Sequence, residues 1–206
     1  MDLSAFAFDL PEELIALRPV EPQDAARLLV VHGDGRLEDA GVRDLPRYLS
    51  AGDTLVFNDT RVIPAALKGV RPARDEAGSD VPVDANLVER VGPETWRALA
   101  RPGKRLKPGD MIRFGEGFEA IVAEKGDGAD LLLTFNRSGD ALDEALDAFG
   151  AMPLPPYIAR RRAADARDRE TYQTSFAGDE AQSVAAPTAG LHFTPRLREE
   201  IAAAGI

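Results

Sequence analysis

Short runs of alternating apolar and polar residues fill the middle of the chain, between residues 64 and 149. They cover residues 65–70, 83–91, 95–100, 111–115, 118–125 and 129–136. Turn residues separate them, at Gly92-Pro93, Pro108-Gly109-Asp110 and Gly126-Asp127-Gly128. Evenly spaced short strands with such turns are typical of a small barrel or sandwich. The pattern therefore predicts a β-rich insert over residues 64–149.

A helical period follows the last of these runs. Leu142, Leu146 and Phe149 recur at i, i+4 and i+7, and Gly150 supplies a C-terminal stop. We therefore expect one helix to close the insert. Inside the insert, residues 71–82 are polar and rich in turn formers, which predicts a flexible loop.

The first 63 residues mix hairpin, helix and strand patterns. Apolar runs on either side of Asp34-Gly35 predict a hairpin, because Asp-Gly favours a tight turn. Residues 42–53 predict a short helix that stops near Gly52. Residues 54–58 are β-branched and aromatic, which predicts a buried strand that runs directly into polar residues.

The last part of the chain has a different texture. Pro153, Pro155 and Pro156 predict an extended segment, and Thr194 with Pro195 predicts a helix start. That helix ends at Gly205 and usually leads into another strand, so we expect an incomplete sheet. The simplest interpretation is an α/β (α+β) main domain, barrel-like and incomplete, formed by residues 1–63 and 150–206. A small antiparallel β-barrel domain, residues 64–149, is inserted into it.

Composition excludes several classes of site. The chain has no cysteine and two histidines, which excludes thiol catalysis and disulfides and makes a histidine-rich metal centre unexpected. We expect no metal, although carboxylate-bound magnesium stays open. There is no run of about 18 apolar residues and no basic leader, so we expect neither a membrane span nor a signal peptide. These features favour a cytoplasmic protein.

Charge is segregated along the sequence. The net charge is -10, yet residues 96–107 contain only basic charges. These are Arg97, Arg101, Lys104, Arg105 and Lys107, and a second cluster is Arg160, Arg161 and Arg162. Such segregation allows an acidic protein to meet phosphates on one face. The alternative is a pair of solvated basic turns.

Three motifs carry candidate chemistry. In residues 183–197, a strand would place His192 and Thr194 on one face and Leu191 and Phe193 on the other. Histidine changes charge near neutral pH and suits general acid–base catalysis, whereas the alternative is a structural histidine beside a tight turn. The set Asn58-Asp59-Thr60-Arg61 follows the predicted strand, where α/β folds place ligand contacts, or forms a polar turn.

The third motif, residues 154–158, precedes Arg160, whose guanidinium can hold an anion in a fork. Its alternative is a rigid linker with Tyr157 packed on the surface. No Gly-x-Gly-x-x-Gly follows a strand and opens a helix, so a Rossmann nucleotide site is not supported.

Several long strings identify a resemblance. In order along the chain they are FDLPEELIA, ARLLVV, GDTLVFNDTRVIPA, LPPYI, YQTSFA and SVAAPTAGLHFT. Together they closely resemble the S-adenosylmethionine:tRNA ribosyltransferase-isomerases of queuosine biosynthesis. Members of that family are considerably longer, so we expect this chain to lack their C-terminal part. The resemblance also implies a two-domain fold with an inserted β-barrel.

The resemblance implies a reaction. The family transfers the ribosyl part of S-adenosylmethionine to the 7-aminomethyl-7-deazaguanine wobble base of tRNA and isomerises it. The product is epoxyqueuosine-tRNA, and adenine and methionine are released. We therefore expect S-adenosylmethionine as co-substrate, tRNA as partner, no membrane partner and a monomer. The rival interpretation is a non-catalytic tRNA-binding fragment, and an enzyme of small molecules without RNA is disfavoured by the basic strip.

On this basis we assign roles as hypotheses. His192, Asp59 and Thr188 are the catalytic candidates, with His192 performing proton transfer. The candidates for binding S-adenosylmethionine are Asn58, Thr60, Arg61, Tyr157, Ala189, Gly190, Phe193 and Thr194. Phe193 or Tyr157 could face the sulfonium, because aromatic faces attract cations. The tRNA-binding candidates are Arg97, Arg101, Lys104, Arg105, Lys107 and Arg160.

Overall fold

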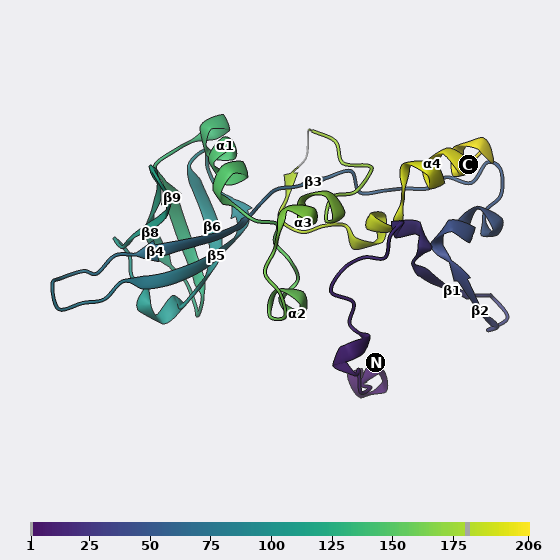
Figure 1. Ribbon diagram of the computed structural model, residues 1–206, viewed down its shortest axis with the longest axis horizontal. Helices are drawn as coiled ribbons and strands as arrows, with labels where there is room; N and C mark the ends of the chain where they lie inside the picture. Colours follow the sequence, from purple (N-terminus) through teal and green to yellow (C-terminus); the bar gives the residue numbers. More distant parts are fainter. Residues whose placement is uncertain (1, 180–181) are drawn as a thin grey trace. The chain divides into compact units, whose positions relative to one another are not determined.

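The computed structural model describes residues 2–179 and 182–206. The chain forms two compact units (Figure 1). Unit 1 contains Met1–Thr54, Pro156–Ala163 and His192–Ile206, and unit 2 contains Leu55–Pro155 and Ala164–Leu191. The domain boundaries inferred from the sequence, at residues 63 and 150, stay a prediction.

Unit 2 is built around a closed antiparallel barrel. Its strands are β4 (Ala66–Arg71), β5 (Val81–Arg90), β6 (Thr95–Arg101), β7 (Met111–Gly115), β8 (Phe118–Lys125) and β9 (Asp130–Phe135). They follow the order β4-β5-β6-β9-β8-β7, and β7 closes the barrel on β4 through Val70 and Arg113. All six strand runs predicted between residues 64 and 149 are confirmed, and the architecture is a barrel rather than a sandwich.

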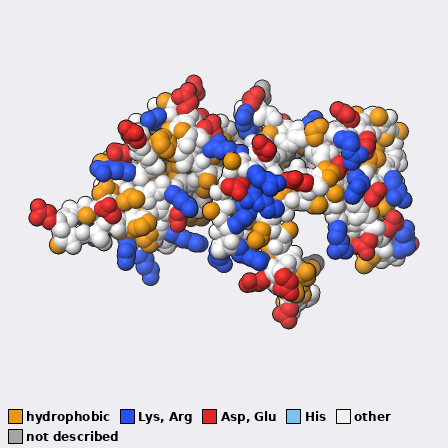
Figure 2. Space-filling view, in the orientation of Figure 1, with side chains coloured by type: hydrophobic (Ala, Val, Ile, Leu, Met, Phe, Trp, Pro, Cys, Tyr) orange, Lys and Arg blue, Asp and Glu red, His pale blue; other side chains and the backbone are white. Residues whose placement is uncertain are grey.

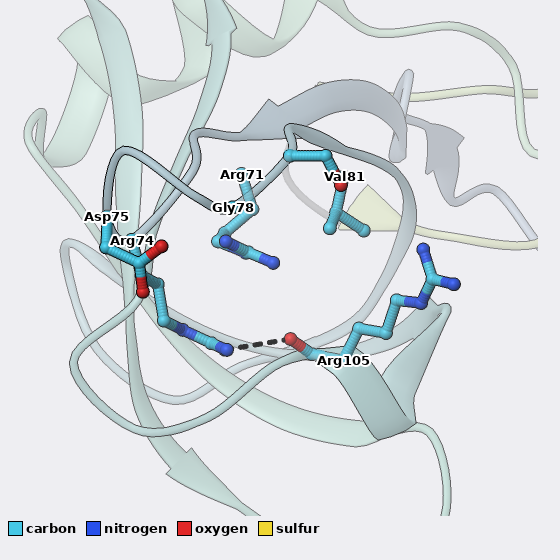
Figure 3. A pocket seen from close by; sticks show the side chains of 7 residues that line it. Arg71, Arg74, Asp75, Gly78, Val81 and Arg105 are labelled. Atoms are coloured by element: carbon cyan, nitrogen blue, oxygen red, sulfur yellow. Dashed lines mark hydrogen bonds between the residues drawn. The ribbon is translucent and has the colours of Figure 1, made fainter.

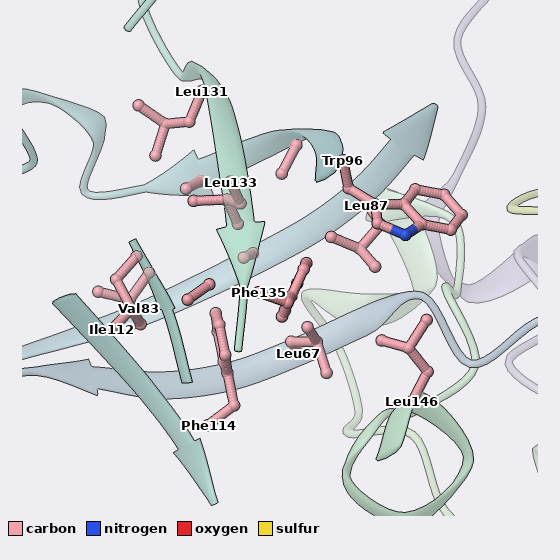
Figure 4. Close-up of a cluster of buried hydrophobic side chains, with 14 of the residues drawn as sticks. Leu67, Val83, Leu87, Trp96, Ile112, Phe114, Leu131, Leu133, Phe135 and Leu146 are labelled. Atoms are coloured by element: carbon pink, nitrogen blue, oxygen red, sulfur yellow. The ribbon is translucent and has the colours of Figure 1, made fainter. Parts of the chain in front are cut away.

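Side-chain alternation fills the barrel interior. Along β5, Val81, Val83, Ala85 and Leu87 are buried, and their immediate neighbours face outward. The other strands contribute Leu67, Trp96, Ile112, Phe118, Leu131, Leu133 and Phe135 to the same core. Figure 4 shows side chains from several strands, among them Leu67, Val83 and Leu133, converging on one interior. Burial of this apolar surface is the main favourable contribution to folding of the barrel.

Helix α1 (Gly139–Phe149) closes one end of the barrel, as predicted. Leu142, Ala145 and Leu146 belong to the barrel core, and the Phe149 ring stacks on Phe118 with centroids 5.5 Å apart. Gly150 follows the helix, and its amide bonds to the Leu146 carbonyl. A Cβ at residue 150 would overlap the carbonyl oxygen of Pro64, so the close approach of the chain requires glycine.

The remainder of unit 2 contains short elements. They are β3 (Arg61–Val62), α3 (Ala166–Thr171), β10 (Gln182–Ser183) and most of the 3-10 helix η6 (Thr188–His192). Strand β3 pairs with β10 in parallel. These elements belong to the segments that precede and follow the barrel in sequence, so unit 2 contains more than the barrel itself.

Unit 1 contains a hairpin, short 3-10 helices and two α-helices. Its elements are η1 (Leu3–Phe6), η2 (Glu12–Leu14), η3 (Gln23–Ala25), β1 (Arg27–Val31), β2 (Leu37–Gly41), η4 (Val42–Tyr48), α2 (Pro156–Ala159) and α4 (Pro195–Ala203). The hairpin is confirmed, with β1 and β2 antiparallel. Thr194 caps α4 by accepting a bond from the amide of Leu197, and Pro195 takes the first helical position, both as predicted.

The carboxylate of Glu38 contacts three side chains in and beside the β1–β2 hairpin of unit 1. Its carboxylate accepts hydrogen bonds from the hydroxyl of Tyr48 at 2.8 Å and the guanidinium of Arg36 at 3.0 Å. The Nε2 atom of His32 lies 3.0 Å from the same carboxylate. The bond from Tyr48, followed by those from Arg36 and His32, lowers the pKa of Glu38 to about 2. His32 therefore has a structural partner within its own hairpin.

Of two local predictions for residues 42–58, the strand is wrong, and the short helix is present but is a 3-10 helix that ends earlier than expected. Residues 54–58 form no strand and Val56 is 90% exposed, because no described strand pairs with this segment. Residues 42–48 form a 3-10 helix, which ends before Gly52. Pro46 lies inside this helix and has no amide hydrogen to donate, which disfavours a regular α-helix there.

The described residues form an α+β fold, as expected. Among them, no helix has both the length and the hydropathy required to span a bilayer.

The barrel core provides a stability prediction. Replacing Leu133 by Ala should lower the free energy of unfolding of the barrel by about 2–5 kcal/mol, because Leu133 is fully buried and the change leaves a cavity. The fluorescence of Trp96, the one tryptophan of the chain, reports barrel unfolding in urea because this ring lies in the core. The matched control is Leu99→Ala on β6, where the side chain is 50% exposed and the effect should be much smaller. Equal losses in both variants would contradict this description of the core.

Candidate functional site

The site begins where the chain enters and leaves the barrel. Strand β3 pairs with β10 through Arg61 opposite Gln182 and Val62 opposite Ser183. The side-chain amide of Gln173 bonds both backbone groups of Val62, accepting from the amide at 2.9 Å and donating to the carbonyl at 3.2 Å. Three segments that are distant in sequence are thereby held together.

The Asn58–Arg61 set forms a polar turn beside this pairing. The Asn58 side-chain oxygen accepts a bond from the Thr60 amide at 2.9 Å, and the Asp59 carbonyl accepts one from the Gly178 amide at 2.7 Å. The guanidinium of Arg61 donates to the exposed carboxylate of Asp179 at 2.7 Å. The turn that the sequence left as an alternative is therefore present, and it leaves Asp59 exposed.

Phe176 joins this turn to the glycine-containing stretch that follows β10, residues 188–191. Its ring stacks on Phe57 with centroids 3.8 Å apart and planes inclined by 16°. A Cβ at Gly190 would lie 3.1 Å from Thr174 Cγ2 and 4.0 Å from Phe176, so the backbone at Gly190 packs closely against the same segment. We call residues 57–61, 173–179 and 188–191 the Phe176 corner.

Two buried hydroxyls lie in the Phe176 corner. Within the described part of the chain, Thr60 Oγ1 and Thr174 Oγ1 are shielded from solvent and have no hydrogen-bond partner. Buried polar atoms are nearly always bonded, and an unbonded one costs free energy unless something else supplies a partner. The arrangement can therefore offer hydroxyl donors and acceptors beside an exposed carboxylate and guanidinium.

The predicted face of His192 is wrong. Residues 188–192 form the 3-10 helix η6 rather than a strand, because the Gly190 amide turns back to bond the Pro187 carbonyl at 2.8 Å. Strand alternation therefore does not hold, and the imidazole of His192 is exposed. The boundary between the two units falls between Leu191 and His192, so Thr188, Ala189 and Gly190 share a unit with Asn58–Arg61, and His192 belongs to unit 1.

A buried carboxylate holds the start of α4 in unit 1. Asp24 is fully buried, and its Oδ2 accepts bonds from Thr194 Oγ1 at 2.6 Å and the Arg196 guanidinium at 2.8 Å. Burial disfavours the charged form, but the bonds from Thr194 and Arg196 outweigh it and lower the pKa of Asp24. Both the donor and the acceptor function of the Thr194 hydroxyl are thus used within the protein. A role for Thr194 in binding S-adenosylmethionine stays a prediction.

The remaining candidates in unit 1 are surface residues. Tyr157 is 54% exposed on α2, Phe193 is half-buried and Arg160 is exposed. The two neighbours of Arg160 have structural partners, since Arg161 donates to the Glu12 carbonyl at 2.6 Å and Arg162 to the Leu17 carbonyl at 2.8 Å. Of the three arginines in this cluster, two therefore hold the N-terminal segment.

The basic strip of the barrel is exposed. Arg97 is partly neutralised, with its guanidinium 3.0 Å from Asp130 and 3.7 Å from Glu89. Arg101, Lys104, Arg105 and Lys107 are all exposed at and beyond the end of β6. Figure 2 shows Lys and Arg side chains spread over the barrel surface rather than gathered in one block.

Comparison with known proteins gives the family. The family model described as a queuosine biosynthesis protein matches residues 3–206. The chain belongs to this family. The S-adenosylmethionine:tRNA ribosyltransferase-isomerase of Hyphomonas neptunium is 73% identical over 206 residues, which is 100% of this chain and 59% of the relative. The enzyme of the same name from Maricaulis maris is 56% identical over 207 residues, 100% of this chain and 58% of the relative.

A solved structure is also similar to this member of the queuosine biosynthesis family. It is the crystal structure of S-adenosylmethionine tRNA ribosyltransferase from Thermotoga maritima, with 30% sequence identity and a TM-score of 0.35. The match covers 97% of this chain and 54% of that chain. The chain therefore spans a little over half the length of the relatives it matches.

Several residues of this family member have contacts that the sequence pattern did not predict. Gln173 and Phe176 lie in the YQTSFA string, which was recognised as a family signature but was given no role. Asp24 and Arg196 lie 172 residues apart and carry no local signal of their contact. Among the described residues, no group of three His, Cys, Asp or Glu side chains is arranged to hold a metal ion.

Asp24 provides a pH prediction for this family member. The folded state lowers the pKa of Asp24, so its stabilisation is present above the unfolded pKa of about 3.9 and is lost as the pH falls through the folded value. Replacing Asp24 by Asn should lower the protection of α4 by about 1–3 kcal/mol at pH 7 and reduce its loss under acid. Hydrogen–deuterium exchange of the α4 peptide measures both effects.

The control for this experiment is Asp39→Asn. Asp39 pairs with Arg27 at 3.5 Å, and both side chains are more than 80% exposed, at 82% and 92%. Its removal should leave α4 protection nearly unchanged, since exposed ion pairs contribute little. An Asp24→Asn variant with unchanged protection at neutral pH would contradict the assignment of Asp24 as the anchor of α4.

Proposed function

We propose that this chain acts in the transfer and isomerisation of the ribosyl group of S-adenosylmethionine onto the 7-aminomethyl-7-deazaguanine wobble base of tRNA. The product would be epoxyqueuosine-tRNA, with release of adenine and methionine. The observation that carries this proposal is the 73% identity over the whole chain with the S-adenosylmethionine:tRNA ribosyltransferase-isomerase of Hyphomonas neptunium. Membership of the queuosine biosynthesis family supports the same assignment.

The Phe176 corner is the proposed site for S-adenosylmethionine. Its two unbonded hydroxyls, Thr60 and Thr174, suit a ligand with several hydroxyl and amine groups. Arg61 is 58% exposed and can exchange Asp179 for the methionine carboxylate, which has the same charge and shape. Asp59 would bind ribose hydroxyls, and the backbone near Gly190 would contact adenine or ribose.

The other proposed contacts surround this site in sequence. Asn58, Thr188 and Ala189 share unit 2 with Asp59, and Tyr157, Phe193 and Thr194 belong to unit 1. S-adenosylmethionine supplies a sulfonium, which acidifies the neighbouring ribose hydrogens. The residue proposed to take a proton there is His192, because an exposed imidazole suits proton transfer near neutral pH. The same imidazole would keep the attacking amine neutral.

One specific observation favours a second function. The chain covers 59% of the Hyphomonas neptunium relative, so groups outside it can be needed for catalysis. In that case the chain would be a non-catalytic tRNA-binding fragment. The closed barrel with its exposed basic strip supports this alternative, because its six strands close on one another within unit 2.

Release of adenine distinguishes the two functions. The chain is incubated with S-adenosylmethionine and tRNA that carries the 7-aminomethyl-7-deazaguanine base, and free adenine is measured by chromatography. We expect adenine to be released, and His192→Ala to lower the rate by at least about 100-fold while tRNA affinity stays the same, as for loss of a general acid–base group. His32→Ala is the matched control, because His32 is bonded within the β1–β2 hairpin.

The Hyphomonas neptunium relative serves as the positive reaction in the same assay. Adenine release by the relative and none by this chain would favour the fragment. Equal rates for His192→Ala and the unaltered protein would remove His192 from the mechanism.

The basic strip gives a salt-dependence prediction. Neutralising Arg101, Lys104 and Lys107 together by Gln should reduce the slope of log affinity against log salt by about one for each phosphate contact removed. Filter binding of tRNA from about 50 to 200 mM salt measures this slope. A triple Gln variant at Arg27, Arg36 and Arg47 removes the same charge from unit 1 and is the control. Identical slopes for the two variants would place the tRNA contacts outside the strip.

A further inference from the structure

A cavity of about 270 Å³ lies at the end of the barrel away from α1. It is formed by the loop between β4 and β5, residues 72–80, and by the 3-10 helix η5 (Gly103–Arg105) that follows β6. The lining residues are Arg71, Arg74, Asp75, Gly78, Ser79, Val81 and Arg105. Figure 3 shows the side chain of Arg71 directed into the space that this loop encloses, whereas Arg105 extends along its rim with the guanidinium turned away from Arg74. Three guanidinium groups thus surround one small cavity.

Arg71 is the most unusual of the three. It is 7% exposed at the end of β4, where a buried charge is costly unless its hydrogens are bonded. Its Nη1 donates to the Pro72 carbonyl at 2.7 Å, but Nε is shielded from solvent and has no acceptor among the described residues. Arg71 also lines the cavity, so its guanidinium can bond an acceptor that a ligand supplies there.

Arg74 has a structural role, because its positive charge is already paired with the carboxylate of Asp110. Its guanidinium forms a two-pronged pair with Asp110, at 2.8 Å from Nε to Oδ1 and 2.6 Å from Nη2 to Oδ2. Asp110 also accepts from the Lys107 amide at 2.8 Å, and Arg74 donates to the Arg105 carbonyl at 2.9 Å. This network fixes the backbone from Arg105 to Asp110 and leaves the Arg105 side chain at the cavity wall.

The side chains that line the cavity carry a net positive charge, although the loop 72–80 also contains Glu76 and Asp80. Arg74 is neutralised by Asp110, and Asp75 offsets one of the remaining two guanidiniums. The Arg105 guanidinium forms no hydrogen bond or ion pair with the residues that the structure describes, since only its backbone amide and carbonyl are bonded. One positive charge and two sets of unused N–H donors therefore remain, and planar guanidiniums match the oxygens of a phosphate.

We propose that this cavity, the Arg71–Arg105 pocket, binds one phosphodiester group of an RNA backbone. An RNA source fits better than a free phosphate because the pocket opens beside Lys104 and Lys107 of the exposed basic strip, along which a backbone can continue. This inference rests on the proposed function, in which tRNA is the substrate. The inference adds a defined site for one backbone phosphate at the loop 72–80, a segment that the sequence predicts only to be a flexible loop.

The test compares single variants of adjacent residues. Arg105→Gln and Lys104→Gln remove the same charge from η5, but only Arg105 lines the pocket. Fluorescence anisotropy with an unmodified tRNA transcript at fixed salt should show about a tenfold loss of affinity for Arg105→Gln and a smaller loss for Lys104→Gln. Arg105→Lys keeps the charge but loses the fork, so it should restore the salt slope and only part of the affinity.

A second arm tests the source of the phosphate. Inorganic phosphate, added against a chloride control of equal ionic strength, should weaken tRNA binding by the unaltered protein and not by Arg105→Gln. Inorganic phosphate could instead stabilise the barrel against unfolding while the unaltered protein, Arg105→Gln and Lys104→Gln bind tRNA with equal affinity. That result would assign the pocket to a free anion and overturn the proposal. Equal affinity for Arg105→Lys and the unaltered protein would also overturn it, because general electrostatics would then be sufficient. Both arms measure binding of unmodified RNA, so the absence of adenine release would contradict the proposed reaction without affecting them.

Discussion

The parallel pairing of Arg61–Val62 with Gln182–Ser183 is the contact on which the candidate site depends. It joins the segment before the barrel to a segment that follows α3. The pairing is only two residues long, yet the closed barrel has already returned the chain to its starting point, where Ala66 pairs with Ala151. Little further loop closure is then required, and the Gln173 amide provides the additional bonds. Phe57 and Phe176 can stack only because these segments meet.

The barrel separates two kinds of polar surface within unit 2. At the end where the chain enters, α1 covers the core and the Phe176 corner presents hydroxyls, a carboxylate and a guanidinium. At the other end, the loop 72–80 and η5 present three guanidiniums, of which the one of Arg74 is paired with Asp110. The first set suits a compact polar ligand, and the second suits a phosphate. Strand alternation keeps the apolar core between them dry and rigid.

The barrel strands, α1 and the Thr194 cap could be predicted because each depends on neighbours in sequence. Residues 54–58 have strand-like composition but no pairing partner, and residues 188–192 turn back at Gly190, so local alternation was misleading at both. The residues of the candidate site also divide into those with a local sequence signal and those that depend on long-range contacts. Asn58–Arg61 was found from its polar residues, whereas the burial of Arg71 and the contacts of Phe176 arise from long-range packing that one sequence does not display.

The length of the barrel has a geometric consequence for any RNA that occupies both ends. The ten residues of β5 extend about 30 Å at the usual rise of a strand. A flexible single strand would lose conformational entropy if it were ordered across both ends of the barrel. A base-paired stem already holds its backbone at fixed separations. Selection of an RNA would then depend on the stiffness and span of the nucleic acid. An RNA stem-loop shorter than the barrel would contact one end of the barrel and not the other.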